Sequence, residues 1–136
     1  MRIRLLAFVS FAAISFAALA LSPAHAQHAA GGGHISGPNG GVVEDIGPFH
    51  AEVVARDGEI VVYLFDGKMR VADTAGAKAR ATIQASGKTA TVDLAPAAPN
   101  VLKATGAFAA GKGAKMVIFL TMPGQKMVQG RFANPG

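Results

Sequence analysis

Apolar and polar residues alternate along most of the chain from Val42 onward, and turn residues interrupt the alternation at short intervals. This spacing predicts short β-strands joined by tight turns. The clearest case is Asp57-Gly58, which separates residues 49–56 from 59–65 and favours a two-residue type I′ hairpin turn. That register gives the hairpin one wholly apolar face, which pairs Ala55 with Ile60, Val53 with Val62 and Ala51 with Leu64.

Two further hairpins follow the same logic. Ser86-Gly87 joins residues 78–85 to 88–94, and its apolar face pairs Ile83 with Ala90, Ala81 with Val92 and Ala79 with Leu94. Pro123-Gly124 joins residues 115–122 to 125–132. Because Pro-Gly favours type I or II turns, it predicts a hairpin without fixing the register.

The remaining segments complete an all-β prediction. Residues 42–46 and 101–108 read as strands, and residues 69–72 as a short edge. Pro96 and Pro99 predict a crossover between two sheets rather than a strand. We therefore expect an antiparallel, immunoglobulin-like β-sandwich of roughly seven to nine strands over residues 42–136.

The N-terminal region predicts export. Arg2 and Arg4 precede an apolar run over residues 5–21, and Ala24-His25-Ala26 offers a small-x-small cleavage site. We expect residues 1–26 to be a cleaved signal peptide, residues 27–41 to be a flexible lead rich in glycine and histidine, and the protein to be periplasmic. No later segment is apolar for long enough to span a bilayer.

Composition narrows the function classes. The chain has no cysteine, which excludes disulfides, thiolate metal sites and cysteine nucleophiles. Without Arg2 and Arg4, 11 basic residues face 8 acidic ones, and the basic residues form no dense run. This distribution is typical of a solvated surface and argues against a nucleic-acid partner.

No motif predicts an enzyme. The glycine-rich stretch 106–113 resembles a P-loop, but Gly113 stands where a magnesium-binding Ser or Thr is needed. No Gly-x-Ser-x-Gly elbow occurs. We therefore expect a glycine-rich loop at 106–113 and a non-enzymatic protein.

Histidines offer the main candidate chemistry. His50 and Glu52 are two residues apart on a predicted strand, so they project from the same face. Imidazole and carboxylate suit Zn²⁺ or Cu²⁺, and His28 or His34 on the lead could complete a site. The alternative is a half-exposed strand histidine beside solvated lead histidines. Three methionines, Met116, Met122 and Met127, could likewise bind Cu(I) or simply fill the core.

One stretch of sequence carries a family resemblance. Residues 37–43 (Gly-Pro-Asn-Gly-Gly-Val-Val), residues 50–54 (His-Ala-Glu-Val-Val) and the later residues 75–82 follow a common pattern. This pattern resembles small exported proteins of Gram-negative bacteria, which are similar to the N-terminal periplasmic module of heavy-metal efflux adaptors. The resemblance covers most of residues 37–133 and implies a compact β domain near copper or zinc traffic, with His50 and Glu52 as functional positions. Ser36 and Asn39 stand where this pattern would favour histidine.

These observations lead to two expectations for function. The first is a periplasmic, non-enzymatic domain that binds a transition metal weakly or assists a heavy-metal efflux system, with His50, Glu52, His34 and His28 as ligands. The second is a protein-interaction module without metal. It would use an exposed sheet edge or the face formed by Val54, Val61, Tyr63 and Phe65, unless a second layer of the sandwich buries that face.

Overall fold

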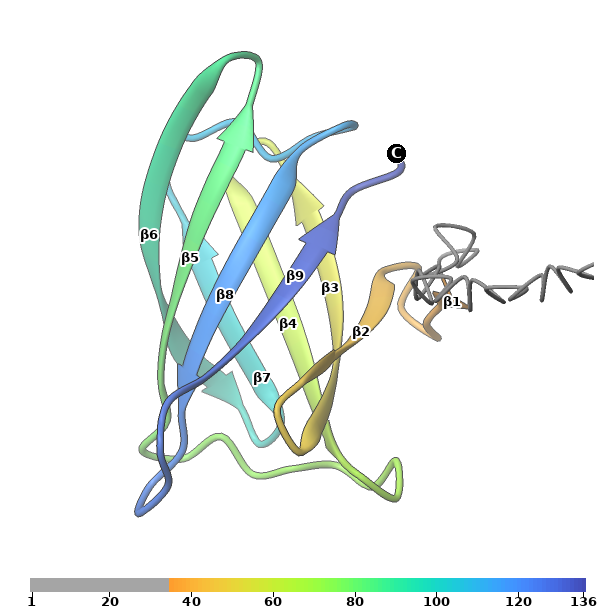
Figure 1. Cartoon of the computed structure of the whole chain (residues 1–136), viewed down its shortest axis with the longest axis vertical. Coiled ribbons are helices and arrows are strands. Elements are labelled where there is room, and N and C mark those ends of the chain that lie inside the picture. Colours follow the sequence, from red (N-terminus) through yellow and green to blue (C-terminus); the bar gives the residue numbers. More distant parts are fainter. Residues whose placement is uncertain (1–34) are drawn as a thin grey trace, which may run out of the picture. The chain divides into compact units, whose positions relative to one another are not determined.

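The computed structural model describes residues 35–136, so the predicted signal peptide and most of the predicted lead lie outside the described residues (Figure 1). This part of the chain forms nine strands. They are β1 (Ile35–Ser36), β2 (Val42–Ile46), β3 (Phe49–Arg56), β4 (Glu59–Asp66), β5 (Lys78–Ala85), β6 (Lys88–Ala98), β7 (Val101–Thr105), β8 (Lys115–Thr121) and β9 (Val128–Ala133). Among these residues there is no helix that is long and apolar enough to cross a membrane. The all-β, antiparallel prediction is confirmed.

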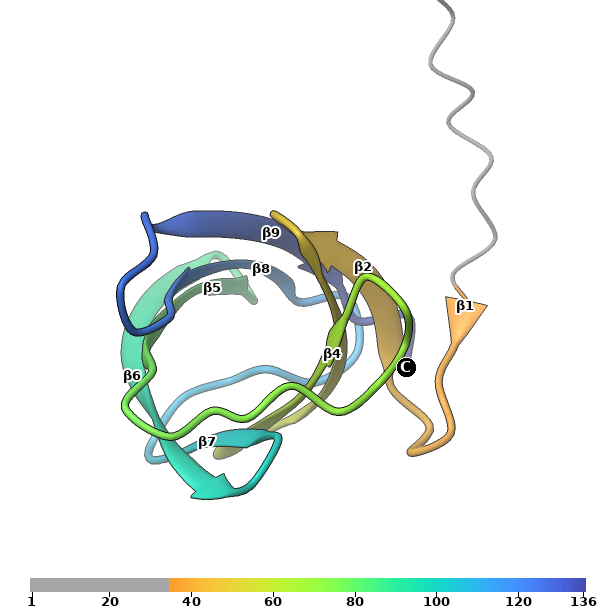
Figure 2. The same ribbon diagram turned by 90° about the horizontal axis from the view of Figure 1, so that it is seen from below.

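The predicted two-sheet sandwich is wrong, because the strands form one strongly curled sheet in the order β1-β2-β3-β4-β7-β6-β5-β8-β9. Figure 2 looks along the strands and shows the sheet bending round on itself. The strands form a single sheet because β6 is long enough to pair with two different strands along its length. Its first part pairs with β5 up to Leu94, and from Ala95 it pairs with β7 instead. Pro96, which predicted a crossover, sits within this strand next to an irregularity in register, where proline is tolerated.

The curled sheet nearly closes on itself where β2, the neighbour of the edge strand β1, approaches the other edge strand, β9. A Cβ atom placed on Gly130 of β9 would lie 2.9 Å from the carbonyl oxygen of Asp45 in β2. One placed on Gly47 would lie 2.5 Å from a methyl carbon of Val128. Such distances leave no room for a side chain, so glycine permits the approach.

Hairpin registers agree with the sequence analysis. All the cross-strand pairs expected for β3–β4 and β5–β6 are present. The turns differ, however: Ser86 and Gly87 both have positive φ, as type I′ requires, whereas only Gly58 of the Asp57-Gly58 pair does. The β8–β9 hairpin is also confirmed. Its Pro-Gly turn closes with a hydrogen bond from Gln125 N to Met122 O (3.0 Å), and the strand ladder begins further out, at Leu120 and Val128.

The core fills the inside of the curl, and loops close both ends. Its members are mostly small or branched aliphatic residues, with Ile60, Leu64, Ile83, Leu102, Ile118 and Leu120 among the largest that are fully buried. At one end the loop 106–114 folds over the core, held by the Asp57 carboxylate and the Asn134 amide. At the other end the loop 67–77 carries the buried Thr74, whose hydroxyl lies 3.1 Å from Ala98 O.

Candidate functional site

His50 lies on β3 directly opposite Asp45 of β2, next to the short turn that joins these strands. Its Nδ1 atom lies 2.6 Å from Asp45 Oδ1. The His50 side chain is 33% exposed and that of Asp45 is 78% exposed, so solvent reaches the pair. Because an ionised carboxylate can only accept, Nδ1 carries the proton. In a neutral ring this leaves the lone pair on Nε2 available to a ligand.

Glu52 projects from the same side of β3 but has a different role. Its side chain is fully buried. Oε1 accepts hydrogen bonds from Asn39 N (2.7 Å) and Gly41 N (2.9 Å), and Oε2 accepts one from Asn39 Nδ2 (2.8 Å). The carboxylate therefore fastens the turn 37–41 onto the sheet, and all three donors come from that turn.

Gly37 makes this arrangement possible. A Cβ atom at residue 37 would lie 2.2 Å from Glu52 Cδ, so any side chain there would collide with the carboxyl group. The glycine-rich stretch 37–41 and β1 thus form a cover over Glu52. Strand β1 pairs with β2 and so continues the sheet beyond that strand. Residues 37–41 belong to the segment predicted from the sequence as a flexible lead. The run of small residues immediately before β2 is the sequence signal that could have linked residues 37–41 to Glu52.

The predicted ligand set is only partly brought together. His50 and Glu52 share a face as expected, but His50 contacts Asp45, and Glu52 is occupied by the turn. His28 and His34 lie outside the described residues. Within residues 35–136, no three His, Cys, Asp or Glu side chains form a group that could hold a metal ion. Asp45, which is not among the residues predicted for the site, is the group that orients the imidazole.

The three candidate methionines differ in burial. Met116 and Met122 are buried in the core, which confirms the gap-filling interpretation for these two. Met127 lies in the β8–β9 loop with 64% of its surface exposed.

The stretch that resembles a P-loop is a cap over one end of the core. Ala110 N and Gly111 N both donate to Asp57 Oδ1, each at 2.9 Å. Ala110 and Ala114 are fully buried, and strand β8 follows rather than a helix. With an acidic side chain on its amides and no helix N-terminus, this loop lacks the geometry that binds phosphate. The glycine-rich loop prediction is confirmed.

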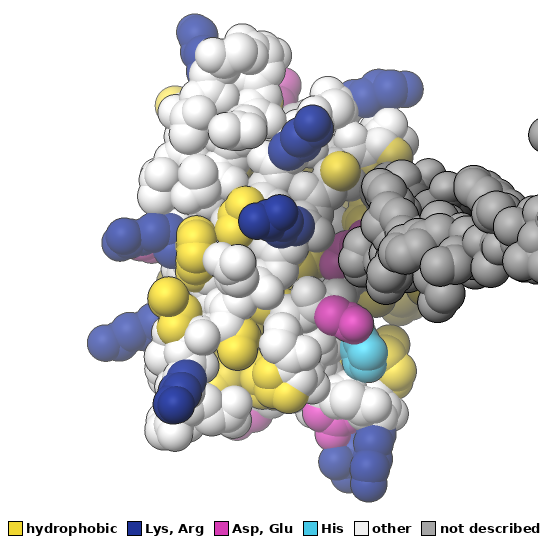
Figure 3. Space-filling model, viewed as in Figure 1, with side chains coloured by type: hydrophobic (Ala, Val, Ile, Leu, Met, Phe, Trp, Pro, Cys, Tyr) yellow, Lys and Arg dark blue, Asp and Glu magenta, His cyan; other side chains and the backbone are white. Residues whose placement is uncertain are grey.

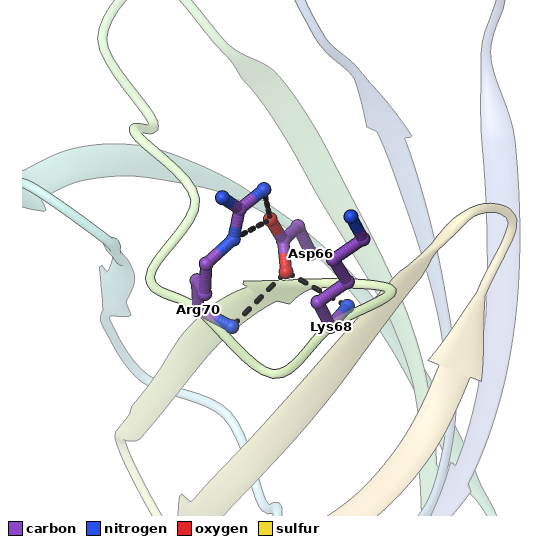
Figure 4. A network of polar contacts seen from close by, with 3 residues as sticks. All are labelled: Asp66, Lys68 and Arg70. Carbon is purple, nitrogen blue, oxygen red and sulfur yellow. Dashed lines mark hydrogen bonds and ion pairs between the residues drawn. The ribbon is translucent and has the colours of Figure 1, made fainter.

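A polar network that is not predicted from the sequence holds the loop after β4 (Figure 4). Asp66 accepts hydrogen bonds from the backbone N–H groups of Lys68 (2.8 Å) and Arg70 (3.0 Å), and from Arg70 Nε (2.8 Å). The Arg70 side chain, followed by these backbone donors, lowers the pKa of Asp66 to about 2. Met69 takes a positive φ at the tip, and its side chain is exposed. This network is local and orders the loop, because its members lie within five consecutive residues.

The face formed by Val54, Val61, Tyr63 and Phe65 points outward from the curled sheet, and all four side chains are half-buried. The expectation that a second layer of a sandwich buries this face is wrong, because the single sheet has its core on the other side.

No known protein family, characterised protein or solved structure matches this chain.

Proposed function

We propose that this protein is a non-enzymatic domain that binds a transition metal ion weakly through Nε2 of His50. The contact between His50 Nδ1 and Asp45 Oδ1, at 2.6 Å, is the observation that supports this proposal. A carboxylate that receives the second ring N–H is the usual partner of a metal-ligating histidine, because it fixes the tautomer and makes the free nitrogen more basic. Both side chains are accessible to solvent, so an ion can reach Nε2.

Glu52 is not a ligand in this proposal, although the sequence analysis favoured it. Coordination would require the carboxylate to give up its three hydrogen bonds to the turn 37–41. Leaving the buried Gly41 N–H unsatisfied costs about 1–3 kcal/mol, and the two bonds from Asn39 would be lost as well, which a weak site cannot offset. Water molecules and the histidines of the lead, His28 and His34, are the remaining donors. His34 immediately precedes β1, which pairs with the strand that carries Asp45.

The cellular setting of this proposal follows from the sequence. The secretory-signal pattern of residues 1–26 supports export, and the sequence resemblance to the periplasmic module of heavy-metal efflux adaptors supports a role beside copper or zinc export. An exported domain with a weak, accessible imidazole site suits the transient capture of Cu²⁺ or Zn²⁺ beside an exporter. We therefore propose an accessory role in efflux rather than storage.

Titration with Zn²⁺ and Cu²⁺, followed by NMR of the histidine rings, tests the proposal. We expect Zn²⁺ to shift, and Cu²⁺ to broaden, the ring signals of His50 at a modest molar excess. His50→Gln should abolish binding, and Asp45→Asn should weaken it about tenfold, because it removes the orienting carboxylate. Asp93→Asn, which changes an exposed ion-paired carboxylate on β6, is the matched control and should have no effect. Unchanged His50 signals, or equal affinity in the His50→Gln variant, would refute the proposal.

An interaction module is the second candidate function, and the outward face of β3 and β4 favours it. Val54, Val61, Tyr63 and Phe65 form a half-buried apolar strip there. Such strips commonly mark interfaces. If Tyr63→Ser and Phe65→Ser unfold at the same urea concentration as the native protein, the strip is free for a partner. A large loss of stability would instead assign it to the fold.

A further inference from the structure

A groove opens on the outside of the sheet where β6 leaves β5. The last cross-strand pair between these strands joins Ala79 and Leu94, and Ala95 then pairs with β7. On one side of the start of β5, β6 therefore turns away and forms one wall of the groove. On the other side, Phe119 of β8 and Met127 of the β8–β9 loop form the opposite wall. The groove has a volume of about 630 Å³, and most of its lining side chains are apolar.

The groove belongs to an apolar surface with basic residues around it. Figure 3 shows hydrophobic side chains gathered on the face where β5, β8 and β9 lie, with Lys and Arg side chains at several points around them. Met127 is 64% exposed, and Phe119 is half-buried. An exposed apolar surface next to a concave site is typical of a binding surface.

Basic residues outnumber acidic ones in and beside the groove. Within residues 35–136, neither Lys78 in the groove nor Lys126 beside Met127 forms a salt bridge with an acidic side chain. Asp93, the acidic residue that lines the groove, is neutralised by Arg80 at 2.8 Å. The groove and its surroundings therefore carry uncompensated positive charge.

We propose that this groove binds an acidic polypeptide segment that carries at least one large apolar side chain. The apolar side chain would lie between Phe119 and the bend of β6, and carboxylates on either side of it would reach Lys78 and Lys126. The concave, apolar lining favours a peptide over a lipid membrane, because a flat lipid surface could contact only the rim of the groove. Charge disfavours a second copy of this chain, because a two-fold contact would bring the same lysines together.

Selection from a library of short random peptides on the immobilised protein tests this proposal. The enriched peptides should be acidic and contain aromatic or large aliphatic residues. A fluorescein-labelled enriched peptide then gives the dissociation constant by fluorescence anisotropy. We expect Lys78→Glu and Met127→Ser each to weaken binding by roughly three- to tenfold, and added salt to weaken it further.

Two matched variants control for charge and for exposed apolar area. Lys88→Glu makes the same charge change at the far end of the β5–β6 hairpin, and Val71→Ser removes a side chain that is as exposed as Met127 but lies outside the groove. Both should bind the peptide as the native protein does. No enrichment, enriched peptides without acidic residues, or equal losses in the control variants would overturn the proposal. So would binding to phosphatidylglycerol vesicles without enrichment of acidic peptides, because that result assigns the surface to a membrane.

Discussion

Replacing Glu52 by alanine should destabilise the protein more than the loss of any other carboxylate in residues 35–136. Glu52 is the acidic residue that is fully buried in this part of the chain, and it receives three hydrogen bonds from the turn 37–41. Removing it leaves those donors without an acceptor and opens a space beneath the turn. The variant therefore tests whether the turn and β1 are held to the sheet by one side chain.

The size of the effect follows from where each donor lies. Hydrogen bonds to a charged group contribute about 1.5–3 kcal/mol each, so three would give an upper limit of roughly 4.5–9 kcal/mol. Asn39 is exposed, however, so its two donors can return to water when the carboxylate is gone. Gly41 N is buried and loses its partner outright. We therefore expect Glu52→Ala to lower the free energy of unfolding by about 2–4 kcal/mol.

Glu52→Gln provides a sharper version of the same test. Both backbone donors, Asn39 N and Gly41 N, bond to the single atom Oε1. A glutamine oxygen placed there keeps both of them, and only the bond from Asn39 Nδ2 is lost. The expected loss is then about 1 kcal/mol.

Urea unfolding at neutral pH, followed by circular dichroism and extrapolated linearly to water, measures these differences. Asp93→Asn is the control, because Asp93 is an exposed carboxylate in a surface ion pair, and its midpoint should stay close to that of the native protein. A Glu52→Ala variant within about 0.5 kcal/mol of the native protein, the range of an ordinary surface substitution, would refute the reasoning.

The remaining predictions concern the loops and the cover over Glu52. Gly37→Ala should lower the urea midpoint clearly because its Cβ would lie 2.2 Å from Glu52 Cδ, whereas Gly106→Ala, with its nearest neighbour at 3.5 Å, should leave it nearly unchanged. Thr74→Val should cost about 1–2 kcal/mol in urea unfolding, because it removes the buried hydroxyl that donates to Ala98 O; an unchanged midpoint would contradict this role. Asp66 has its pKa lowered to about 2 from an ordinary 3.8, so its contribution is present above about pH 4 and disappears as the pH falls towards 2. The melting temperatures of the native protein and Asp66→Asn should therefore converge between pH 4 and pH 2, and a constant difference would contradict the network in Figure 4.

Hairpins were predictable from the sequence because their determinants are local. In a strand of period two, a register error of one residue would move every apolar side chain to the wrong face, so the pattern around Asp57-Gly58 and Ser86-Gly87 allowed one solution. The type of the turn at Asp57-Gly58 was not predictable from this local pattern. Asp57 keeps a negative φ while its carboxylate binds the amides of residues 110 and 111, which are more than fifty residues away in the chain.

The sequence by itself also determined that His50 and Glu52 share one face of a strand, since that follows from backbone geometry alone. Only the tertiary structure decided that they have different partners: β2 brings Asp45 to the imidazole, and the turn 37–41 covers the carboxylate. The same division applies to the architecture. Alternation marks which residues face a core, but one curled sheet and two stacked sheets bury the same residues. The choice between them depends on whether β6 stays paired as it bends past Pro96, a non-local backbone contact that leaves no mark on the pattern of side chains.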